Sequence, residues 1–97
     1  MYNIISCYTD DDIYRPQAER LKDSLDSLGI DTSHINPFED AGGWEKNCQH
    51  KAIFIREKLK ELDSPVVWVD CDAIVLKEPT LFDDYEHDIG VFHPEFL

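Results

Sequence analysis

The chain alternates short apolar segments with longer segments whose apolar residues recur at helical spacing, and this alternation restricts its fold more than any other feature. Residues 2–8 and 66–70 are mostly apolar or aromatic, which is typical of strands buried in a sheet. Residues 14–28 and 44–62 carry an apolar stripe with charged residues between its members, which is typical of amphipathic helices. We therefore expect strands and helices to alternate along most of the chain.

Each helical segment also predicts the face that packs on the sheet. In the first segment the stripe consists of Ala18, Leu21, Leu25 and Leu28, and Gly29 follows as a helix C-cap. In the second segment the main stripe consists of Cys48, Ala52, Ile55, Leu59 and Leu62, and Ile53 and Phe54 broaden it. Ser64-Pro65 ends the helix. Helices with an apolar stripe of this kind cover the faces of a sheet.

The remaining segments complete the predicted order of elements. Residues 36–43 are a loop and residues 79–84 a turn segment, and further short strands are predicted at residues 30–35, 73–76 and 89–92. The order begins as a βαβαβ unit, which implies an α/β fold with a largely parallel sheet flanked by helices. Ligands of such sheets bind beyond the carboxyl ends of the strands.

Length and charge limit the classes of protein to which the chain can belong. Its 97 residues predict a single domain over residues 1–97, and its net charge of −12 argues against nucleic acid and anionic membranes as partners. No apolar run reaches the roughly 18 residues that span a bilayer, and the first residues do not resemble a signal peptide. The cysteines lack close metal-type spacing and predict free thiols: Cys7, Cys48 and Cys71. We therefore expect a cytoplasmic protein.

Two acids one residue apart, Asp70 and Asp72, follow the second apolar strand. In an extended segment residues i and i+2 point to the same face, so both carboxylates would approach one cation. Hard oxygen ligands suit Mg²⁺ or Mn²⁺, and such ions bind the phosphates of a substrate. The pair alone is a weak signal, because the acidic chain also contains Asp10-Asp11-Asp12 and Asp83-Asp84. Its position between two apolar runs makes it the strongest metal-site candidate.

The segment from Val66 to Phe82 resembles the DXD segment of nucleotide-diphospho-sugar transferases with the A-type glycosyltransferase fold (GT-A), a group that includes glycogenin. The resemblance lies in an apolar strand, Asp-x-Asp, a second apolar strand, and then a Pro and a Leu-Phe turn. Upstream, residues 6–10 with Tyr14 are similar to the first strand and loop of that group. Residues of the second helical segment resemble the helix that precedes the DXD strand: Trp44, Asn47, Lys51 and Phe54. The likeness covers the nucleotide-binding half of such enzymes, which run to more than twice this length.

The resemblance implies a role for each matching residue. Asp72 would bind the metal, Mn²⁺ or Mg²⁺, directly, and Asp70 would contact the ribose and reach the metal through water or one oxygen. Lys51 would contact ribose, phosphate or an acidic partner. The residues placed about the base and ribose of a uridine nucleotide are Tyr8 and Tyr14, which flank the base, with Thr9, Asp10 and Cys71. No catalytic residue is singled out.

Other roles and assemblies follow from the same likeness. The predicted function is metal-dependent transfer of a glycosyl group from a nucleotide sugar, UDP-sugar being the expected donor, to an acceptor that the sequence does not identify. The alternative is a nucleotide or nucleotide-sugar binding module with no transfer or only slow donor hydrolysis. A shortened sheet would expose an edge and an apolar face, which favours a homodimer. His87 or His93 could add a metal ligand, whereas His34 and His50 are expected on the surface.

Two further readings of Asp70-Cys71-Asp72 are less consistent with the chain. The motif also resembles the nucleophile strand of phosphatases of the haloacid-dehalogenase type, but there it opens the domain and a long catalytic region follows. Response-receiver domains also carry acids after their first and third strands. They need a later strand that ends in Lys, and no Lys follows Lys77.

Overall fold

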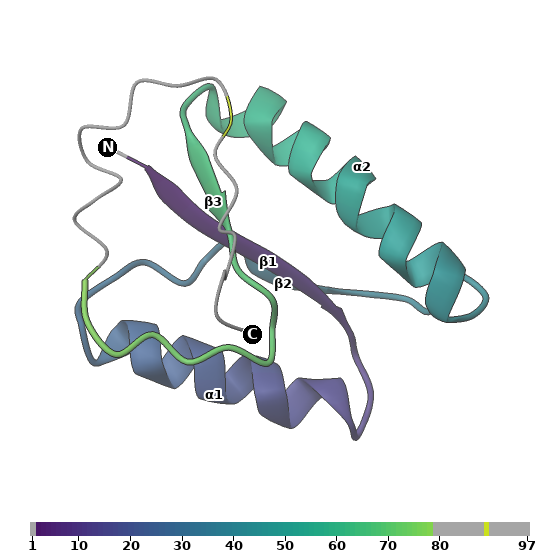
Figure 1. The fold of residues 1–97 in the computed structure, drawn as a ribbon, viewed down its shortest axis with the longest axis horizontal. Coiled ribbons are helices and arrows are strands. Elements are labelled where there is room, and N and C mark those ends of the chain that lie inside the picture. Colours follow the sequence, from purple (N-terminus) through teal and green to yellow (C-terminus); the bar gives the residue numbers. More distant parts are fainter. Residues whose placement is uncertain (1, 79–88, 90–97) are drawn as a thin grey trace, which may run out of the picture.

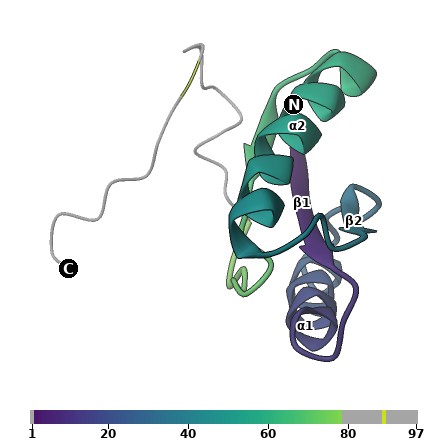
Figure 2. The same cartoon turned by 90° about the vertical axis from the view of Figure 1, so that its right-hand side faces the viewer.

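A parallel three-stranded sheet lies between two helices in the computed structural model, which describes residues 2–78 and 89 (Figures 1 and 2). The elements follow in the order β1 (Asn3–Thr9), α1 (Tyr14–Asp26), β2 (Ile35–Phe38), α2 (Trp44–Leu62) and β3 (Val66–Trp68). This is the α/β class predicted from the sequence, in the form of a Rossmann-like half-fold. The predicted turn at 79–84 and the predicted strand at 89–92, Ile89 excepted, lie outside the described residues.

The strand order β2-β1-β3 puts β1 at the centre of the sheet. Ser6 of β1 is opposite Ile35 of β2, and Ile4 of β1 is opposite Val67 of β3. The chain therefore moves from β1 to one neighbour and then crosses to the other side of β1. In open parallel sheets ligands bind at such a reversal, in the crevice beyond the carboxyl ends of the strands.

The face of the sheet under α1 carries the main core. Ile4 and Tyr8 of β1 pack with Ile35 of β2 against the buried face of α1, which consists of Ala18, Leu21 and Leu25. This confirms the predicted stripe of the first helix, apart from half-buried Leu28, which follows the end of the helix. Gly29 adopts the left-handed conformation (φ +72°), and the Ile30 N–H donates to the carbonyl of Leu25, as the predicted C-cap requires.

The opposite face of the sheet is covered by α2, which starts and ends at the predicted residues but is rotated from the predicted stripe. Ala52 is exposed and Leu59 is 46% exposed, whereas Phe54 packs edge-on against Trp68 of β3 with ring centroids 6.3 Å apart. The inward face of α2 is half-buried and partly polar: Asn47, Cys48, Lys51, Phe54, Ile55, Lys58 and Leu62. The aliphatic stems of lysine side chains can cover apolar surface in this way. Apolar residues alone were therefore the wrong criterion for the face of α2 that packs on the sheet.

Two predicted strands are wrong. The strand predicted at residues 30–35 lies at Ile35–Phe38, because pairing with β1 decides its position and an edge strand tolerates Pro37. Residues 36–38, which were predicted as loop, are therefore strand. Residues 73–76 form no strand, because the Val75 N–H donates to Ser24 Oγ of α1 at 3.0 Å instead of joining the sheet. Within the described part of the chain, none of the helices has the length and apolarity needed to cross a membrane.

Candidate functional site at the carboxyl ends of β1 and β3

A pocket of about 170 Å³, partly open to solvent, lies at the carboxyl ends of β1 and β3. The first turn of α1 and the first half of α2 also line it. Its walls contain all of the predicted site residues except Asp10: Tyr8, Thr9, Tyr14, Lys51, Asp70, Cys71 and Asp72. These residues come from the end of β1, the first turn of α1, the middle of α2 and the turn after β3. The sheet topology brings them together, because the carboxyl ends of parallel strands meet at one edge.

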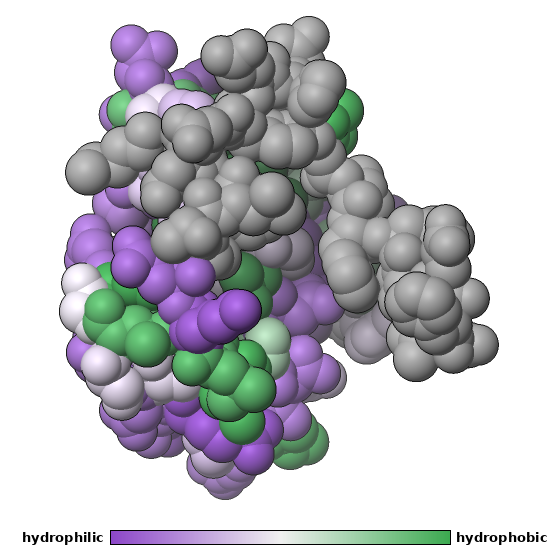
Figure 3. Space-filling view, turned by 60° about the vertical axis from the view of Figure 1, so that its left-hand side comes forward, coloured by the Kyte–Doolittle hydropathy of each residue, from purple (hydrophilic) through white to green (hydrophobic). Residues whose placement is uncertain are grey.

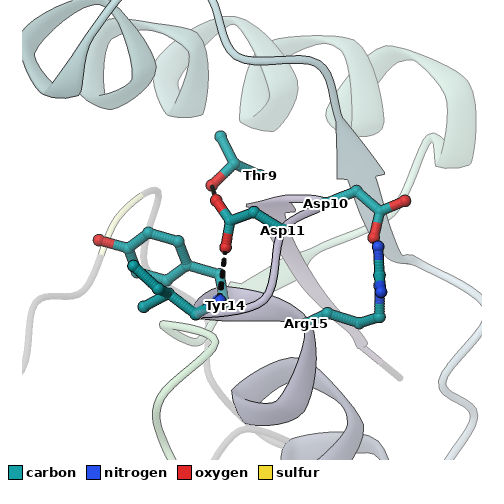
Figure 4. A network of polar contacts seen from close by, with 6 residues as sticks. Thr9, Asp10, Asp11, Tyr14 and Arg15 are labelled. Atoms are coloured by element: carbon teal, nitrogen blue, oxygen red, sulfur yellow. Dashed lines mark hydrogen bonds and ion pairs between the residues drawn. The ribbon is translucent and has the colours of Figure 1, made fainter.

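Asp10 lies outside this pocket. Its carboxylate is paired with Arg15, with Nε and Oδ1 2.6 Å apart (Figure 4). It also lines a separate acidic depression together with Glu39 and Asp40. Both members of the ion pair are about half exposed. The residue that follows β1 therefore points away from the other predicted site residues.

Asp11, rather than Asp10, organises the turn that carries Tyr14 to the pocket (Figure 4). Its Oδ1 accepts the N–H groups of Ile13 and Tyr14 at 2.9 and 2.7 Å, and Thr9 Oγ1 donates to its Oδ2 at 2.9 Å. The Tyr14 N–H is the largest influence that lowers the pKa of Asp11, and the Thr9 hydroxyl adds to it. The charged carboxylate thus fixes the start of α1 and the direction in which Tyr14 leaves the helix.

The charged side of the pocket is built around Asp70. Its Oδ1 accepts a hydrogen bond from Trp68 Nε1 at 3.0 Å and lies 3.7 Å from Lys51 Nζ. The Lys51 ammonium also lies 5.9 Å from the centre of the Trp68 ring. Both contacts are made to Oδ1 of Asp70.

The predicted geometry of the two acids is wrong in one respect. Asp70 and Asp72 do not lie in an extended segment, because the Ala73 N–H donates to the carbonyl of Asp70 at 3.0 Å and closes a turn after β3. The rule that residues i and i+2 share a strand face therefore does not apply here. Both side chains nevertheless line the same pocket.

The carboxylates fit one kind of metal site better than others. Within residues 2–78 and 89, no three side chains of the metal-binding types His, Cys, Asp and Glu lie close enough to hold an ion. A structural zinc site needs four such ligands, whereas Mg²⁺ keeps several waters and takes one or two carboxylates plus substrate phosphates. Asp70 and Asp72 line the pocket together, and two carboxylates are what the second arrangement requires. His87 and His93 lie outside the described residues.

All three cysteines line the pocket; Cys71 was predicted there, whereas Cys7 and Cys48 were not. Burial raises the pKa of the Cys7 thiol to about 11, against an opposing effect of Lys51. Burial also raises the pKa of Cys71, and the Asp72 carboxylate raises it further. Cys7 and Cys71 are therefore protonated near neutral pH. A protonated thiol is a poor nucleophile and a poor metal ligand, so these two side chains contribute shape rather than thiolate chemistry.

Four aromatic side chains also line the pocket, and the sequence indicated only part of them. Phe38 at the end of β2 and Trp44 at the start of α2 join the predicted Tyr8 and Tyr14. Trp44 lies one and two helical turns before Cys48 and Lys51, so helical spacing from Lys51 could have identified it. Phe38 could not be found in this way, because Asn36-Pro37 was taken as the start of a loop.

Comparisons with known proteins identify no relative of this chain. No protein-family model matches it, and no curated protein and no solved structure is significantly similar to it.

Proposed function

We propose that this chain binds a nucleoside diphosphate sugar, with uridine as the nucleoside, and transfers its glycosyl group in a metal-dependent reaction. One observation carries the proposal: aromatic and charged side chains from separate segments line a single pocket at the reversal of strand order. A ligand with a planar ring and a diphosphate matches the aromatic and the charged side chains of that pocket. The DXD-type sequence after β3 narrows the class to nucleotide sugars by resemblance.

Different residues of the pocket would bind the base, the diphosphate and the metal. The aromatic side chains, which include Tyr14, would stack on the base, and such stacking contributes about 1–3 kcal/mol per base. Lys51 would face the diphosphate, with Asp70 and Trp68 holding its ammonium in position. Asp72 and Asp70 would hold Mn²⁺ or Mg²⁺. Such an ion supplies Lewis-acid stabilisation of the charge on the departing nucleoside diphosphate.

The alternative, binding without transfer, is favoured by the size of the pocket. The described residues enclose about 170 Å³, whereas pockets that bury a small-molecule ligand usually have about 300–1,000 Å³. Glycosyl transfer needs an oriented acceptor and exclusion of water. A pocket of this size holds one end of a nucleotide sugar and leaves the sugar in solvent. The two candidates differ in one measurable result, which is consumption of the donor with transfer to an acceptor.

Calorimetric titration with UDP, UDP-sugars and purine nucleotides, in Mn²⁺ and then in chelator, tests the proposal. We expect binding of UDP and UDP-sugars in Mn²⁺, weaker binding in chelator, and loss of the metal-dependent part in Asp72→Ala. Asp23→Ala removes an exposed acid of α1 that lies outside the pocket and is the matched control. Unchanged UDP affinity in Asp72→Ala, or equal affinity for purine nucleotides, would contradict the proposed site.

We also propose that the protein acts as a homodimer. Among the described residues β2 and β3 are the edge strands of the sheet, and Leu76 and Ile74 expose 87% and 49% of their surface. Apolar patches interrupt an otherwise polar surface on one side of the molecule (Figure 3). Sedimentation at micromolar concentration should give the mass of a dimer, and a monomer there would contradict this assembly.

A further inference from the structure

Trp44 is the most unusual residue of the pocket, because it lines the wall and is 77% exposed. Large aromatic side chains usually bury most of their surface, and exposing an indole is unfavourable. At the N-terminal end of α2, this side chain is the first residue of the helix and adds little to the core. Its position therefore needs an explanation other than stability.

The loop that leads to Trp44 is ordered by hydrogen bonds before α2 begins. Asp40 Oδ1 accepts the N–H groups of Gly42 and Gly43 at 2.9 and 3.0 Å and the Asn47 amide at 3.2 Å. The Ala41 N–H donates to Asn47 Oδ1 at 2.7 Å. Both glycines have φ near the value that only glycine adopts readily, +113° and +116°. A hydrogen-bonded loop of this kind directs the first residue of the helix rather than leaving it loose.

The other aromatic rings of the pocket offer less surface to a ligand. Tyr8 is 8% exposed and belongs to the core, and Lys22 Nζ lies over its ring at 5.8 Å. Phe38 is stacked on His50, with ring centroids 4.2 Å apart. Tyr14 is 38% exposed, half as much as Trp44. A planar ligand entering from solvent therefore meets Trp44 and Tyr14 before the other two rings.

The distance from Trp44 to the charged side of the pocket indicates how a bound ligand is oriented. Lys51 lies two turns further along the same helix, about 10 Å along its axis, and pairs with Asp70. A ring stacked on Trp44 thus has its phosphates directed along α2 toward Lys51. This spacing suits a nucleotide with a diphosphate better than a free base or a monosaccharide.

We infer that Trp44 is the principal stacking surface for the base of the nucleotide, in place of the buried Tyr8. The inference rests on the proposed function and assigns a residue of α2 to specificity for the base. Trp44 contacts only the base of the nucleotide, because the phosphates lie near Lys51 at the other end of the pocket. Removing the indole should therefore lower the affinity for ligands that carry a base and leave the affinity for pyrophosphate with its metal ion unchanged.

The test compares wild type, Trp44→Leu and Trp44→Phe in titrations with UDP and with pyrophosphate, both in Mn²⁺. Leu keeps an apolar side chain without a ring, and Phe keeps a ring. We expect UDP affinity to fall about tenfold or more in Trp44→Leu, to stay within about threefold of wild type in Trp44→Phe, and pyrophosphate affinity to stay constant. Ile53→Ala, which alters an exposed apolar residue of the same helix outside the pocket, should leave the affinity for both ligands unchanged.

The outcomes separate this inference from the proposed function. Wild-type protein that binds UDP while Trp44→Leu binds it equally well overturns the stacking role of Trp44 alone. Equal losses for UDP and pyrophosphate in Trp44→Leu also overturn it, because they indicate a distorted pocket. Wild-type protein that binds no UDP overturns the proposed function and this inference together.

Discussion

Trp68 Nε1 donates a hydrogen bond to Asp70 Oδ1 across 3.0 Å, from the last residue of β3 to the first acid of the turn that follows. The same oxygen faces the Lys51 ammonium, which lies over the Trp68 ring. Trp68 therefore contacts both members of the ion pair, once through its N–H group and once through its π face. The sequence predicted Trp68 only as a strand residue. Its contacts show that it positions the charged groups of the pocket.

Replacing Trp68 with Phe should weaken UDP binding in Mn²⁺ by about 2- to 10-fold, because a net hydrogen bond contributes about 0.5–1.5 kcal/mol. Phe keeps an aromatic ring beside Phe54 and beneath Lys51, so the fold should persist. Calorimetric titration measures the affinity of Trp68→Phe, Asp70→Asn and the double variant. If Trp68 acts through Asp70, the double variant binds no more weakly than Asp70→Asn alone. Additive losses would contradict this coupling.

Asp11 should stabilise the start of α1 more than its neighbour Asp12 does. Asp11→Ala removes the acceptor of the Ile13 and Tyr14 N–H groups and should lower the melting temperature by several degrees. Asp12→Ala removes the same charge from an exposed neighbour and should change the melting temperature little. Thermal unfolding followed by circular dichroism at pH 7 compares the variants, and equal melting temperatures would exclude the capping role.

The contribution of Asp11 should also depend on pH in a defined direction. Its hydrogen bonds, chiefly the one from the Tyr14 N–H, lower its pKa below the ordinary value of 3.8. A carboxyl group whose pKa is lowered on folding contributes stability that is complete above 3.8 and is lost as pH falls through the lower folded value. The difference in melting temperature between wild type and Asp11→Ala should therefore hold from pH 7 to pH 5 and shrink in more acidic solution.

The parts of the fold that the sequence predicted correctly are those decided by local pattern. The period of apolar residues and the Ser64-Pro65 stop are sufficient to predict α2, because both act within the helix itself. The continuous apolar run of β1 predicts a buried strand for a similar reason. The α/β class then follows from the order of the elements.

Tertiary contacts decide the parts that were predicted wrongly. The position of β2 depends on pairing with residues 6–9 of β1. In the segment 73–76, the Val75 N–H donates to Ser24 of α1 instead of joining the sheet. The rotation of α2 depends on the contact between Phe54 and Trp68. None of these partners is close in sequence, so local periodicity carries no information about them.

The candidate site shows the same division. The resemblance to the DXD segment, together with the rule that ligands bind beyond strand ends, indicated the site residues, and all of them except Asp10 line the pocket. Asp10 differs because Arg15, on the following helix, pairs with it. Trp44 and Phe38 enter the pocket through the placement of α2 and β2, which the sequence alone did not give in detail.

Cys7 should make the protein less stable in alkaline solution. Burial raises its pKa from 9.0 to about 11, with Lys51 opposing and Cys71 adding to the shift. A group whose pKa is raised on folding contributes stability that is complete below the unfolded value of 9.0 and is lost as pH rises toward about 11. Urea unfolding should therefore show a fall in the free energy of unfolding above pH 9 that is less steep in Cys7→Ala. Below pH 9 the two proteins should differ by a constant amount, and parallel curves across the whole range would show that burial of this thiol has no such effect.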